Sequence, residues 1–322
     1  MKPLALSTFI LVSAVFAASA AEPAATPPPP KDPLVVALEA LKSEDAMTRR
    51  RGAYNLGDLR NKKGVQPLIN ALNDENPFVR TGAISSLAKL GANESAKKIL
   101  AMLGKDKDSQ VRQQAANAFA NLDIKGEVQA LIKALQDESK GVRFAAARTL
   151  GSTRSQAAAK KLAELLTSPE ENAGMRRVAA GALRSIRSKE TLPALEQALS
   201  DEDLNVRRQA VQAVQAIGNK GSVPKLKKLL KDEDAQVRVL AIQALAKFGD
   251  HSGIATAVEM LGHTDARVRQ QAANAIGRVG SGKKTIASLK KAIKNEKNAG
   301  VKRSITFAIQ RLEAAEKRKA KQ

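Results

Sequence analysis

The residues with the clearest chemical pattern are basic side chains that recur along the chain at a near-constant interval. They are Arg49, Arg80, Arg112, Arg143, Arg176, Arg207, Arg238, Arg269 and Lys302. Six residues before seven of them stands an acid, namely Asp74, Asp106, Asp137, Glu170, Asp201, Asp232 and Glu296, whereas Ser43 and His263 depart from the pattern. Matching rows of Arg and carboxylate form charge-assisted, often bidentate hydrogen bonds. We therefore predict a ladder in which each base pairs with the acid six positions earlier or with the next acid along the chain.

The spacing of the basic residues predicts an array of stacked repeats. Successive bases lie 31 to 33 residues apart. The octapeptide VRQQAANA occurs at 111–118 and again at 268–275, 157 positions later, in the same register to the nearby base. Self-similarity at such a period is typical of repeat architectures. Nine units then fill residues 34–314.

Each unit reads as two helices. The first half carries Leu at i and i+4, as in LPALEQAL (192–199) and VPKLKKLL (223–230). The second half begins at the base and places apolar residues at positions −1, +3, +7 and +10 relative to it, which is one face of a helix. Position +3 is mostly Ala, which lets a neighbouring backbone come close. Gly91, Gly218, Gly249 and Gly280 are expected to end their helices as C-terminal caps.

These features resemble the HEAT repeat, specifically the short type first noted in phycobilin lyases. The resemblance is carried by the D-x5-R spacing, by Pro67, Pro193 and Pro224 in first helices, and by the Ala/Leu pattern. It implies an all-α fold, an α-solenoid (armadillo/HEAT-like superhelix) of about nine two-helix repeats. It also implies that the Asp and Arg form a ladder between neighbouring units and that the second helices line a concave side.

Two rows of residues are neighbours on the surface of the second helices, opposite the buried face. The +1 row is Arg50, Thr81, Gln113, Phe144, Arg177, Arg208, Val239, Gln270 and Arg303; the +5 row is Tyr54, Ser85, Asn117, Arg148, Gly181, Gln212, Gln243, Asn274 and Phe307. From them we take as candidate binding residues Arg50, Tyr54, Gln113, Asn117, Phe144, Arg148, Arg177, Arg208, Gln212, Gln243, Gln270 and Asn274. Phe144 beside Arg148 is the expected contact anchor, because aromatic and Arg residues dominate binding hot spots. The alternative is plain exposed helix surface.

Charge is concentrated at the C-terminal end. The chain has 54 Lys and Arg against 32 acids, a net charge of +22, and residues 278–322 hold 14 bases and three Glu. The candidate polyanion-binding residues are Lys283, Lys284, Lys290, Lys291, Lys294, Lys317, Arg318, Lys319 and Lys321. A like-charge block is often an interaction tail. The alternative is a solvated face with a frayed basic tail over 315–322 that keeps the array soluble.

The N-terminus has the pattern of a secretory signal peptide over residues 1–20. Lys2 precedes an apolar run, and the small residues ASA precede an expected cleavage after Ala20. Residues 21–33 then form a Pro-rich linker. The sequence therefore predicts export to the periplasm or beyond the cell, the alternative being an uncleaved membrane anchor. No other segment approaches a transmembrane length.

The chemistry of enzymes is missing from the sequence. There is no Cys, and neither His251 nor His263 is followed by Glu, unlike the His-Glu pairs that hold iron in deoxyhypusine hydroxylase. GSGKK (280–284) lacks the spacing of a phosphate loop and is interpreted as a turn between units. We expect a non-enzymatic scaffold for protein partners, with no metal or cofactor. The second hypothesis is a cationic binder of an anionic envelope polymer, lipid headgroup or nucleic acid. Because Trp is absent and aromatic residues are few, nucleic acid is the least expected of these.

Overall fold

A computed structural model describes residues 31–123, 128–280 and 282–320 of the chain. These residues form 18 α-helices and six short 3-10 helices, with no β-strand among them. The helices alternate as the repeat pattern predicts, two to a unit, so the all-α solenoid expected from the sequence is confirmed. The expected signal peptide and most of the Pro-rich linker lie outside the described residues.

The first helices of the units are short. They are α1 (Pro33–Ala40), α3 (Val65–Ala71), α5 (Ala96–Lys105), α7 (Val128–Ala134), α9 (Ala159–Thr167), α11 (Leu192–Ala198), α13 (Val223–Lys228), α15 (Ile254–Met260) and α17 (Gly282–Asn295). A 3-10 turn precedes or follows several of them: η1 (Lys62–Gly64), η2 (Asn93–Ser95), η3 (Gln156–Ala158), η4 (Lys189–Thr191), η5 (Lys220–Ser222) and η6 (Leu229–Lys231).

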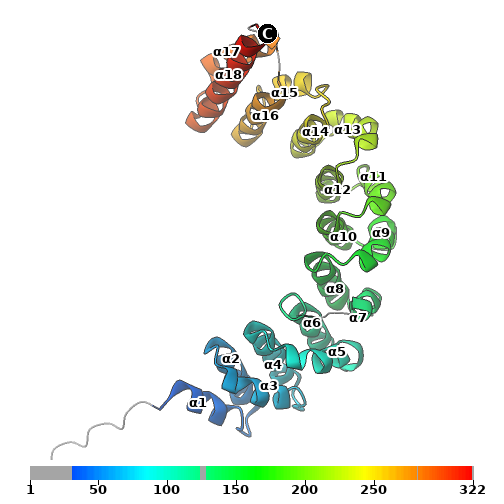
Figure 1. The fold of residues 1–322 in the computed structure, drawn as a ribbon, viewed down its shortest axis with the longest axis vertical. Coiled ribbons are helices and arrows are strands. Elements are labelled where there is room, and N and C mark those ends of the chain that lie inside the picture. Colours follow the sequence, from blue (N-terminus) through cyan, green and yellow to red (C-terminus); the bar gives the residue numbers. More distant parts are fainter. Residues whose placement is uncertain (1–30, 124–127, 281, 321–322) are drawn as a thin grey trace, which may run out of the picture. The chain divides into compact units, whose positions relative to one another are not determined.

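The second helices are mostly longer. They are α2 (Ala46–Asp58), α4 (Pro77–Leu90), α6 (Ser109–Ala118), α8 (Lys140–Ser152), α10 (Ala173–Ile186), α12 (Leu204–Ile217), α14 (Ala235–Lys247), α16 (Ala266–Val279) and α18 (Ala299–Lys319). Each packs on its own first helix and on the second helices of adjacent units. Even-numbered helices therefore follow one another in one row and odd-numbered helices in another, as Figure 1 shows.

The second helices begin three residues before the base, earlier than the sequence pattern indicated, and each start is capped. The N-cap residues all lie four positions before the base: Asp45, Asn76, Asp108, Ser139, Asn172, Asp203, Asp234, Asp265 and Asn298. In all of them except Ser139 the side chain accepts a hydrogen bond from a backbone N–H of the first turn. Such caps each stabilise a helix start by about 1 kcal/mol.

The apolar face predicted for the second helices is the buried face. In α4, Val79, Ala83 and Leu87 at −1, +3 and +7 are fully buried. In the first repeat, position +3 lies close to the backbone of the preceding helix. At Gly52 a Cβ atom would lie 2.7 Å from the backbone nitrogen of Leu41, so only a residue without a side chain fits there.

The helix ends follow the predicted glycines, with one difference. Gly91 and Gly218 cap α4 and α12 in the left-handed conformation, and Gly249 also has a positive φ. Gly280 ends α16 with extended backbone instead, at φ −63° and ψ 151°. The left-handed residue of that connection is Gly282, at which α17 begins. The stretch 280–284, interpreted from sequence as a turn, therefore already contains the first turn of a helix.

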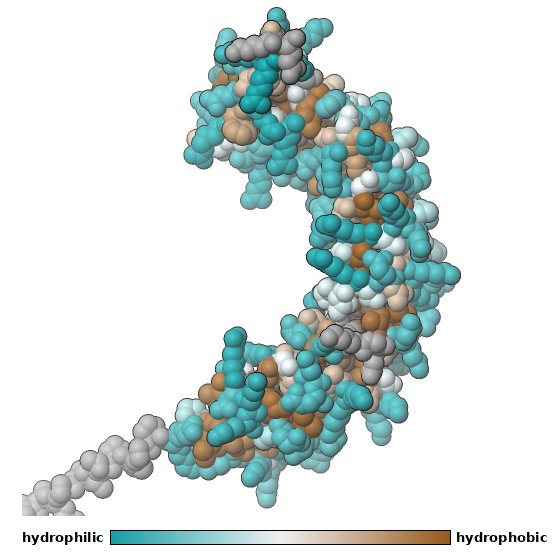
Figure 2. All heavy atoms as spheres, in the orientation of Figure 1, coloured by the Kyte–Doolittle hydropathy of each residue, from teal (hydrophilic) through white to brown (hydrophobic). Residues whose placement is uncertain are grey.

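The buried residues form two clusters rather than one, and they divide at α14. Val237, Ala241 and Leu245 of α14 belong to the cluster that runs back to α1. Val239 and Ile242 of the same helix belong to the cluster that continues to α18. The division thus runs through α14 itself, and the second cluster continues across the junction between α14 and α16. In Figure 2 hydrophilic residues cover most of the visible surface, with apolar residues between them.

Candidate functional site

The most regular polar feature of the array is a rung of hydrogen bonds at the start of each second helix. Arg207 Nε and Nη2 donate to the two carboxylate oxygens of Asp232 at 2.9 and 3.0 Å. Its Nη1 donates to the backbone carbonyls of Asp201 and Glu202 at 2.9 and 3.0 Å. The side chains of Arg207 and Asp232 are only 8% and 7% exposed. One guanidinium therefore ties the loop of its own repeat to the loop of the following one.

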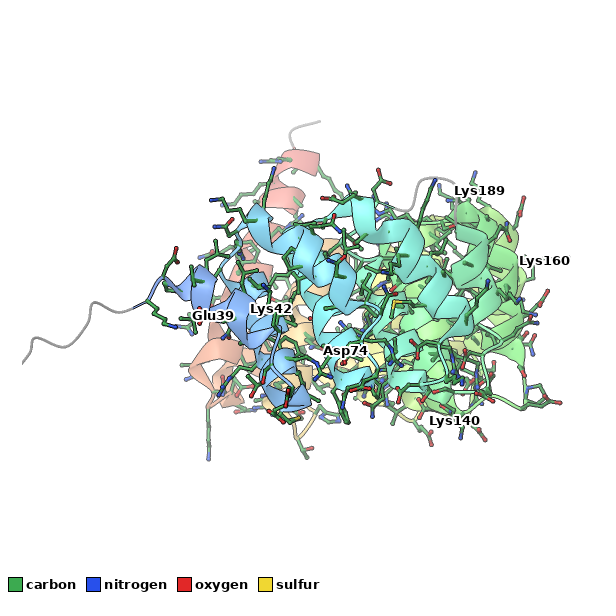
Figure 3. All side chains as sticks on the ribbon, turned by 90° about the horizontal axis from the view of Figure 1, so that it is seen from below. Glu39, Lys42, Asp74, Lys140, Lys160 and Lys189 are labelled. Atoms are coloured by element: carbon green, nitrogen blue, oxygen red, sulfur yellow. The ribbon has the colours of Figure 1, made fainter. Side chains whose placement is uncertain are left out.

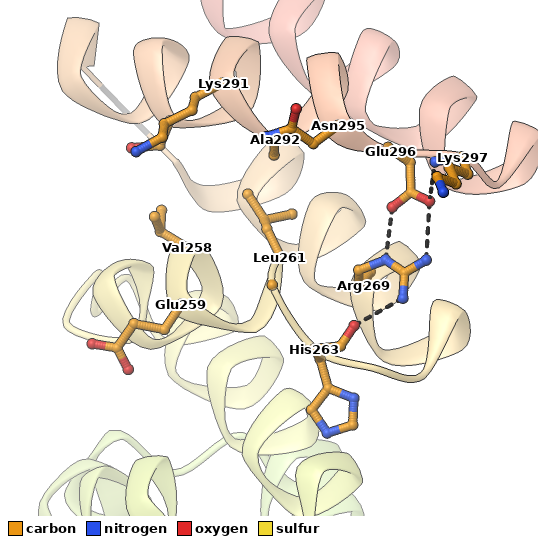
Figure 4. A pocket seen from close by; sticks show the side chains of 12 residues that line it. Val258, Glu259, Leu261, His263, Arg269, Lys291, Ala292, Asn295, Glu296 and Lys297 are labelled. Atoms are coloured by element: carbon orange, nitrogen blue, oxygen red, sulfur yellow. Dashed lines mark hydrogen bonds and ion pairs between the residues drawn. The ribbon is translucent and has the colours of Figure 1, made fainter.

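The carboxylate of a rung comes from the following repeat. Six such pairs lie along the array: Arg49–Asp74, Arg80–Asp106, Arg112–Asp137, Arg176–Asp201, Arg207–Asp232 and Arg269–Glu296. The acid six positions before each Arg contributes its backbone carbonyl in several of these rungs, as Asp74 does for Arg80 at 2.9 Å. Figure 4 shows the last rung, with Arg269 between Glu296 and the carbonyl of His263.

The rungs hold their carboxylates ionised. Burial by itself raises the pKa of Asp137, but the hydrogen bonds from Arg112 and from the Ser139 N–H outweigh it, so the pKa is lowered. The hydrogen bond from Arg269 is the main cause that lowers the pKa of Glu296, to about 2. The same hydrogen bonds raise the pKa of the guanidinium of Arg112. The carboxylates of Asp137 and Glu296 are thus ionised throughout the neutral pH range.

One rung is displaced from the predicted position. Glu170 was the expected acid after Arg143, but Glu171 makes the ion pair, at 3.5 Å from Arg143 Nε. Arg143 Nε is buried and has no hydrogen-bond partner within the described residues. In the other rungs the acid stands two positions before the N-cap residue, whereas Glu171 stands one position before Asn172. This shift of one residue in the loop lengthens the ion pair.

Another rung is open. Arg238 donates through Nη1 to the carbonyls of Asp232 and Glu233, and no carboxylate in the described part of the chain completes the pair. The position of the acid is held by His263, whose Nδ1 accepts the backbone N–H of Asp265 at 3.0 Å. An aspartate at this place accepts the equivalent N–H and still has a second oxygen for the Arg, as Asp232 does with Asp234. An imidazole nitrogen has one lone pair, so His263 keeps the turn and loses the rung.

The candidate binding residues all lie on the second helices, as the helical register requires. Gln113, Arg148, Arg177 and Asn274 are exposed, whereas Arg50, Tyr54, Asn117, Phe144, Arg208, Gln212, Gln243 and Gln270 are partly buried. Several of them are already engaged within the array. Arg208 makes a bidentate pair with Asp234 at 3.0 and 2.7 Å, and Gln212 accepts a hydrogen bond from Arg184.

Phe144 and Arg148, the anchor expected from sequence, are also held by neighbours. Phe144 packs against the core, and its ring lies over Gly174 of the next repeat, where a Cβ atom would be 3.2 Å from Cζ. Arg148 donates to Asn117 at 2.7 Å. Part of the apolar surface of Phe144 is therefore already buried against the next repeat.

A second aromatic–Arg group lies at the N-terminal end of the same face. The guanidinium of Arg50 is 5.5 Å from the ring centre of Tyr54 and 5.4 Å from that of Phe78. Phe78 stands two positions before the base Arg80, outside the two rows considered above. The sequence signal that finds it is this −2 position, which is bulky and apolar only in the first two repeats, as Met47 and Phe78.

The basic C-terminal residues lie on α17 and α18. Lys283, Lys284, Lys290, Lys291 and Lys294 are exposed on α17, and Lys317, Arg318 and Lys319 are exposed on α18. Two of them meet acids: Lys290 pairs with Glu313 at 2.7 Å, and Lys319 lies 3.5 Å from Glu316. Since α18 continues to Lys319, most of the expected frayed tail is helical. Lys321 lies outside the described residues.

A groove separates α15 from α17 on the first-helix side (Figure 4). It has a volume of about 660 Å³, with Val258, Leu261 and Ala292 between the charged side chains of Glu259 and Lys291. An equivalent groove of about 520 Å³ lies between α1 and α3, lined by Leu38, Leu41 and Ala71. Its recurrence at the same repeat position indicates that the groove follows from the spacing of first helices.

Two absences hold for the part of the chain that the structure describes. No three His, Cys, Asp or Glu side chains there gather into a group that could hold a metal ion. Over the same residues no helix is both long and apolar enough to cross a membrane.

Two-helix units that stack in register and are joined by Arg–carboxylate rungs define the class of the protein, a helical repeat solenoid. A family model described as HEAT repeats matches residues 34–120, 98–174, 168–238 and 223–310. The chain belongs to the HEAT-repeat family.

The relatives are consistent with this assignment. A HEAT repeat-containing taxis protein of Halobacterium salinarum is 30% identical over 165 residues, which is 51% of this chain and 37% of that protein. This chain therefore spans well under half of the length of that relative. In solved structures, the crystal structure of an engineered protein is 23% identical with a TM-score of 0.52, covering 87% of this chain and 89% of that one. The X-ray structure of YibA from E. coli is 22% identical with a TM-score of 0.60, covering 84% and 98%. At these identities the two structures establish the fold alone.

Proposed function

We propose that the chain is an exported, non-enzymatic scaffold that binds a protein partner along its row of second helices. HEAT repeats generally mediate protein–protein interaction. Solenoids of this kind hold partners through many modest contacts on an extended surface. Fold alone does not choose the surface, so the proposal depends on what the second helices present.

The observation that carries the proposal is the separation of two sets of basic residues. Arg112, Arg176 and Arg207 of the rungs are buried and paired with carboxylates. The +1 and +5 rows lie on the other side of the same helices and leave Arg148 and Arg177 exposed among amides. Arg and amide side chains donate and accept hydrogen bonds with the backbone or side chains of a bound segment.

The proposal is tested by a pull-down from envelope extract with the purified protein at about 0.15 M and about 0.5 M salt. A discrete partner protein retained at both concentrations is expected, because screening at the higher one removes purely electrostatic binding. Arg148→Glu with Arg177→Glu should release that partner.

The matched control is Lys160→Glu with Lys189→Glu. Both lysines are exposed, and they project from the first-helix side in Figure 3, whereas Asp74 lies within the body of the array. This pair makes the same change in charge and should retain the partner. Release by both pairs, or by neither, would contradict binding through the second helices.

Export is the second part of the proposal, and its support is the pattern of residues 1–20. Fractionation of the producing cell should place the protein outside the cytoplasm, and its N-terminal sequence should begin at Ala21. A charge in the apolar run, as in Val15→Lys, should retain the uncleaved chain in the cytoplasm. A mature protein that begins at Met1 would contradict cleavage.

A second candidate function is the binding of an anionic polymer or lipid headgroup at the C-terminal end. It is favoured by the exposed lysines of α17, several of which have no acidic partner among the described residues. Removing residues 315–322 together with Lys290→Gln and Lys291→Gln should flatten the salt dependence of such binding. Retention of polyanions alone in the pull-down, lost at the higher salt, would favour this function over the scaffold.

A further inference from the structure

At the N-terminal end of the second-helix face, the guanidinium of Arg50 lies close to two aromatic rings. Arg50 of α2 lies between Tyr54 of the same helix and Phe78 of α4, with its guanidinium 5.5 and 5.4 Å from their ring centres. Tyr54 lies beside Gly82 of α4, where a Cβ atom would be at ordinary contact distance, 3.6 Å, from Tyr54 Cε2. Rings at these distances attract a cation and fix the plane of the guanidinium.

Arg50 differs from Arg148 and Arg208 of these rows in what it lacks. Its Nε is buried without a hydrogen-bond partner, and no acceptor for its N–H groups is present within the described residues. Arg208, at the same +1 position, is neutralised by Asp234, and Arg148 donates to Asn117. A desolvated donor without an acceptor destabilises the fold, and more so when the group is charged. This unpaired donor of Arg50 lies on the solvent-facing side of the second helices.

Apolar surface flanks the cation. Met47 is 59% exposed and Phe78 is 44% exposed, both among the largest exposed fractions of any big apolar side chain described. A cavity of about 520 Å³ opens here, lined by Asp45, Met47, Thr48, Arg50, Arg51 and Tyr54. The acid in this lining, Asp45, is committed to Thr48, whose backbone N–H and hydroxyl donate to it at 2.8 and 2.7 Å. The cavity therefore offers the cations of Arg50 and Arg51 and apolar area, beside one carboxylate that caps α2 through its Oδ2.

The combination occurs only at this end of the array. At the −2 position the first two repeats have Met47 and Phe78, and the others have Gln110, Gly141, Gly174, Asn205, Gln236, Arg267 and Gly300. Repeat geometry explains features that recur, such as the rungs and the first-helix grooves. It does not explain a group confined to two repeats.

We propose that Arg50, Tyr54, Phe78 and Met47, here termed the N-terminal clasp, bind a protein segment in which an Asp or Glu adjoins an apolar side chain. The carboxylate accepts from Arg50, and the apolar side chain packs against Met47 and Phe78. A protein segment fits better than a phosphate polymer, because a phosphate chain offers no apolar surface to cover Met47 and Phe78. Clustered aromatic and Arg side chains are the groups that dominate binding energy in interfaces. The inference rests on the proposed scaffold function and names the chemistry of its partner.

The test is selection of a phage-displayed random peptide library of about twelve residues against the purified protein. Enriched peptides should carry Asp or Glu next to Leu, Met or an aromatic residue. Synthetic copies, labelled with fluorescein and measured by anisotropy, should bind Arg50→Gln and Tyr54→Ala at least about tenfold more weakly than the original chain. Tyr54→Phe should bind as the original does, since it keeps the ring.

The matched control is Arg267→Gln, which removes an exposed Arg in the first turn of α16, outside the two candidate rows and in a repeat without aromatic residues. It should leave peptide affinity within about twofold. Because Arg50→Gln removes a packed side chain, the melting of each variant is followed by circular dichroism. Arg50→Lys is a second variant that keeps the charge and loses the planar stack, and it should also weaken binding.

Other results would overturn the inference. Peptides that lack acids, or that bind Arg50→Gln unchanged, would remove the clasp while leaving a scaffold that binds elsewhere on the second helices. No enrichment over uncoated support would also overturn it, and the pull-down would then decide the scaffold function separately. An oligothymidylate that binds the original chain and not Arg50→Gln would assign the clasp to nucleic acid instead.

Discussion

Two neighbouring junctions of the array both stack one second helix on the next, but their rungs differ. Between α12 and α14 the pair of Arg207 and Asp232 is closed and almost fully buried. Between α14 and α16, Arg238 reaches only backbone carbonyls, because His263 stands where the acid would be. The apolar core continues across this second junction, where Val239 and Ile242 of α14 share a cluster with Val268 and Ala272 of α16. Helix stacking therefore continues without the rung, and the rung is an added constraint on how two repeats are held.

The comparison also assigns the rung a role in stability. A closed rung contains a buried acid whose counter-ion is the Arg, so removal of the Arg leaves a buried charge with only a backbone N–H as partner. An open rung contains no such acid. The same substitution should thus have unequal costs at the two junctions. Because the repeats unfold as coupled units, destabilising one junction also lowers the stability of the neighbouring repeats.

The largest effect should come from acid, which protonates the rung carboxylates whose pKa is lowered in the fold. The pKa of Glu296 is lowered to about 2 from 4.5, and those of Asp74 and Asp137 are lowered too. Carboxylates with lowered pKa stabilise the fold above their unfolded pKa, and this stability is lost as the pH falls through the folded pKa. The free energy of unfolding, measured by urea denaturation, should therefore fall steeply from about pH 4.5 towards pH 2. Asp74→Asn should reduce the slope, and a flat profile over this range would contradict the ladder as a source of stability.

Breaking a closed rung should cost more than removing the Arg of the open one. We expect Arg207→Ala to lower the free energy of unfolding by about 3 kcal/mol, because Asp232 is left buried and unpaired. Arg238→Ala should cost about 1 kcal/mol, through the loss of its two carbonyl hydrogen bonds. Urea denaturation at pH 7 measures both, and equal costs would mean that the carboxylate adds nothing.

The displaced rung should lie between these limits. Arg143 and Glu171 are 3.5 Å apart, and Arg143 Nε has no hydrogen bond. Glu171→Gln should lower the stability by about 1 kcal/mol, less than the loss of a bidentate pair. Thermal melting followed by circular dichroism is sufficient to rank it against Arg207→Ala. A cost equal to that of Arg207→Ala would show that the longer pair is as strong as the others.

Closing the open rung is the sharpest form of the comparison and has the smallest expected effect. His263→Asp should supply both the acceptor for the Asp265 N–H and the carboxylate for Arg238. We expect a gain of about 0.5–1 kcal/mol, since the new attraction is offset by desolvation of the pair. In the background of His263→Asp, Arg238→Ala should become as costly as Arg207→Ala. A double-mutant cycle without coupling would mean that the two side chains do not meet.

Much of the architecture could be predicted from local pattern. The interval between bases, the apolar face and the glycines at helix ends placed two helices in each unit, because these depend on residues close in sequence. The starts of the second helices were placed three residues late, although Asp, Asn or Ser stands four positions before every base as an N-cap. The −2 position that carries Met47 and Phe78 was visible in the same alignment, but only the packing of α2 against α4 shows that Phe78 meets Arg50.

What the sequence alone determined is the set of groups that must be satisfied: helices with one apolar face, and rows of Arg and acid in matching register. Which acid meets which Arg was decided by tertiary structure. Six positions along the chain and twenty-five positions to the next repeat are equally compatible with the spacing, and only the distance between stacked loops selects the second, as for Arg207 and Asp232. The same packing left Arg238 without a carboxylate and enclosed Arg50 between two rings. Hydrogen bonds and ring contacts act over a few ångströms, so residues distant in sequence acquire these partners only once the helices are stacked.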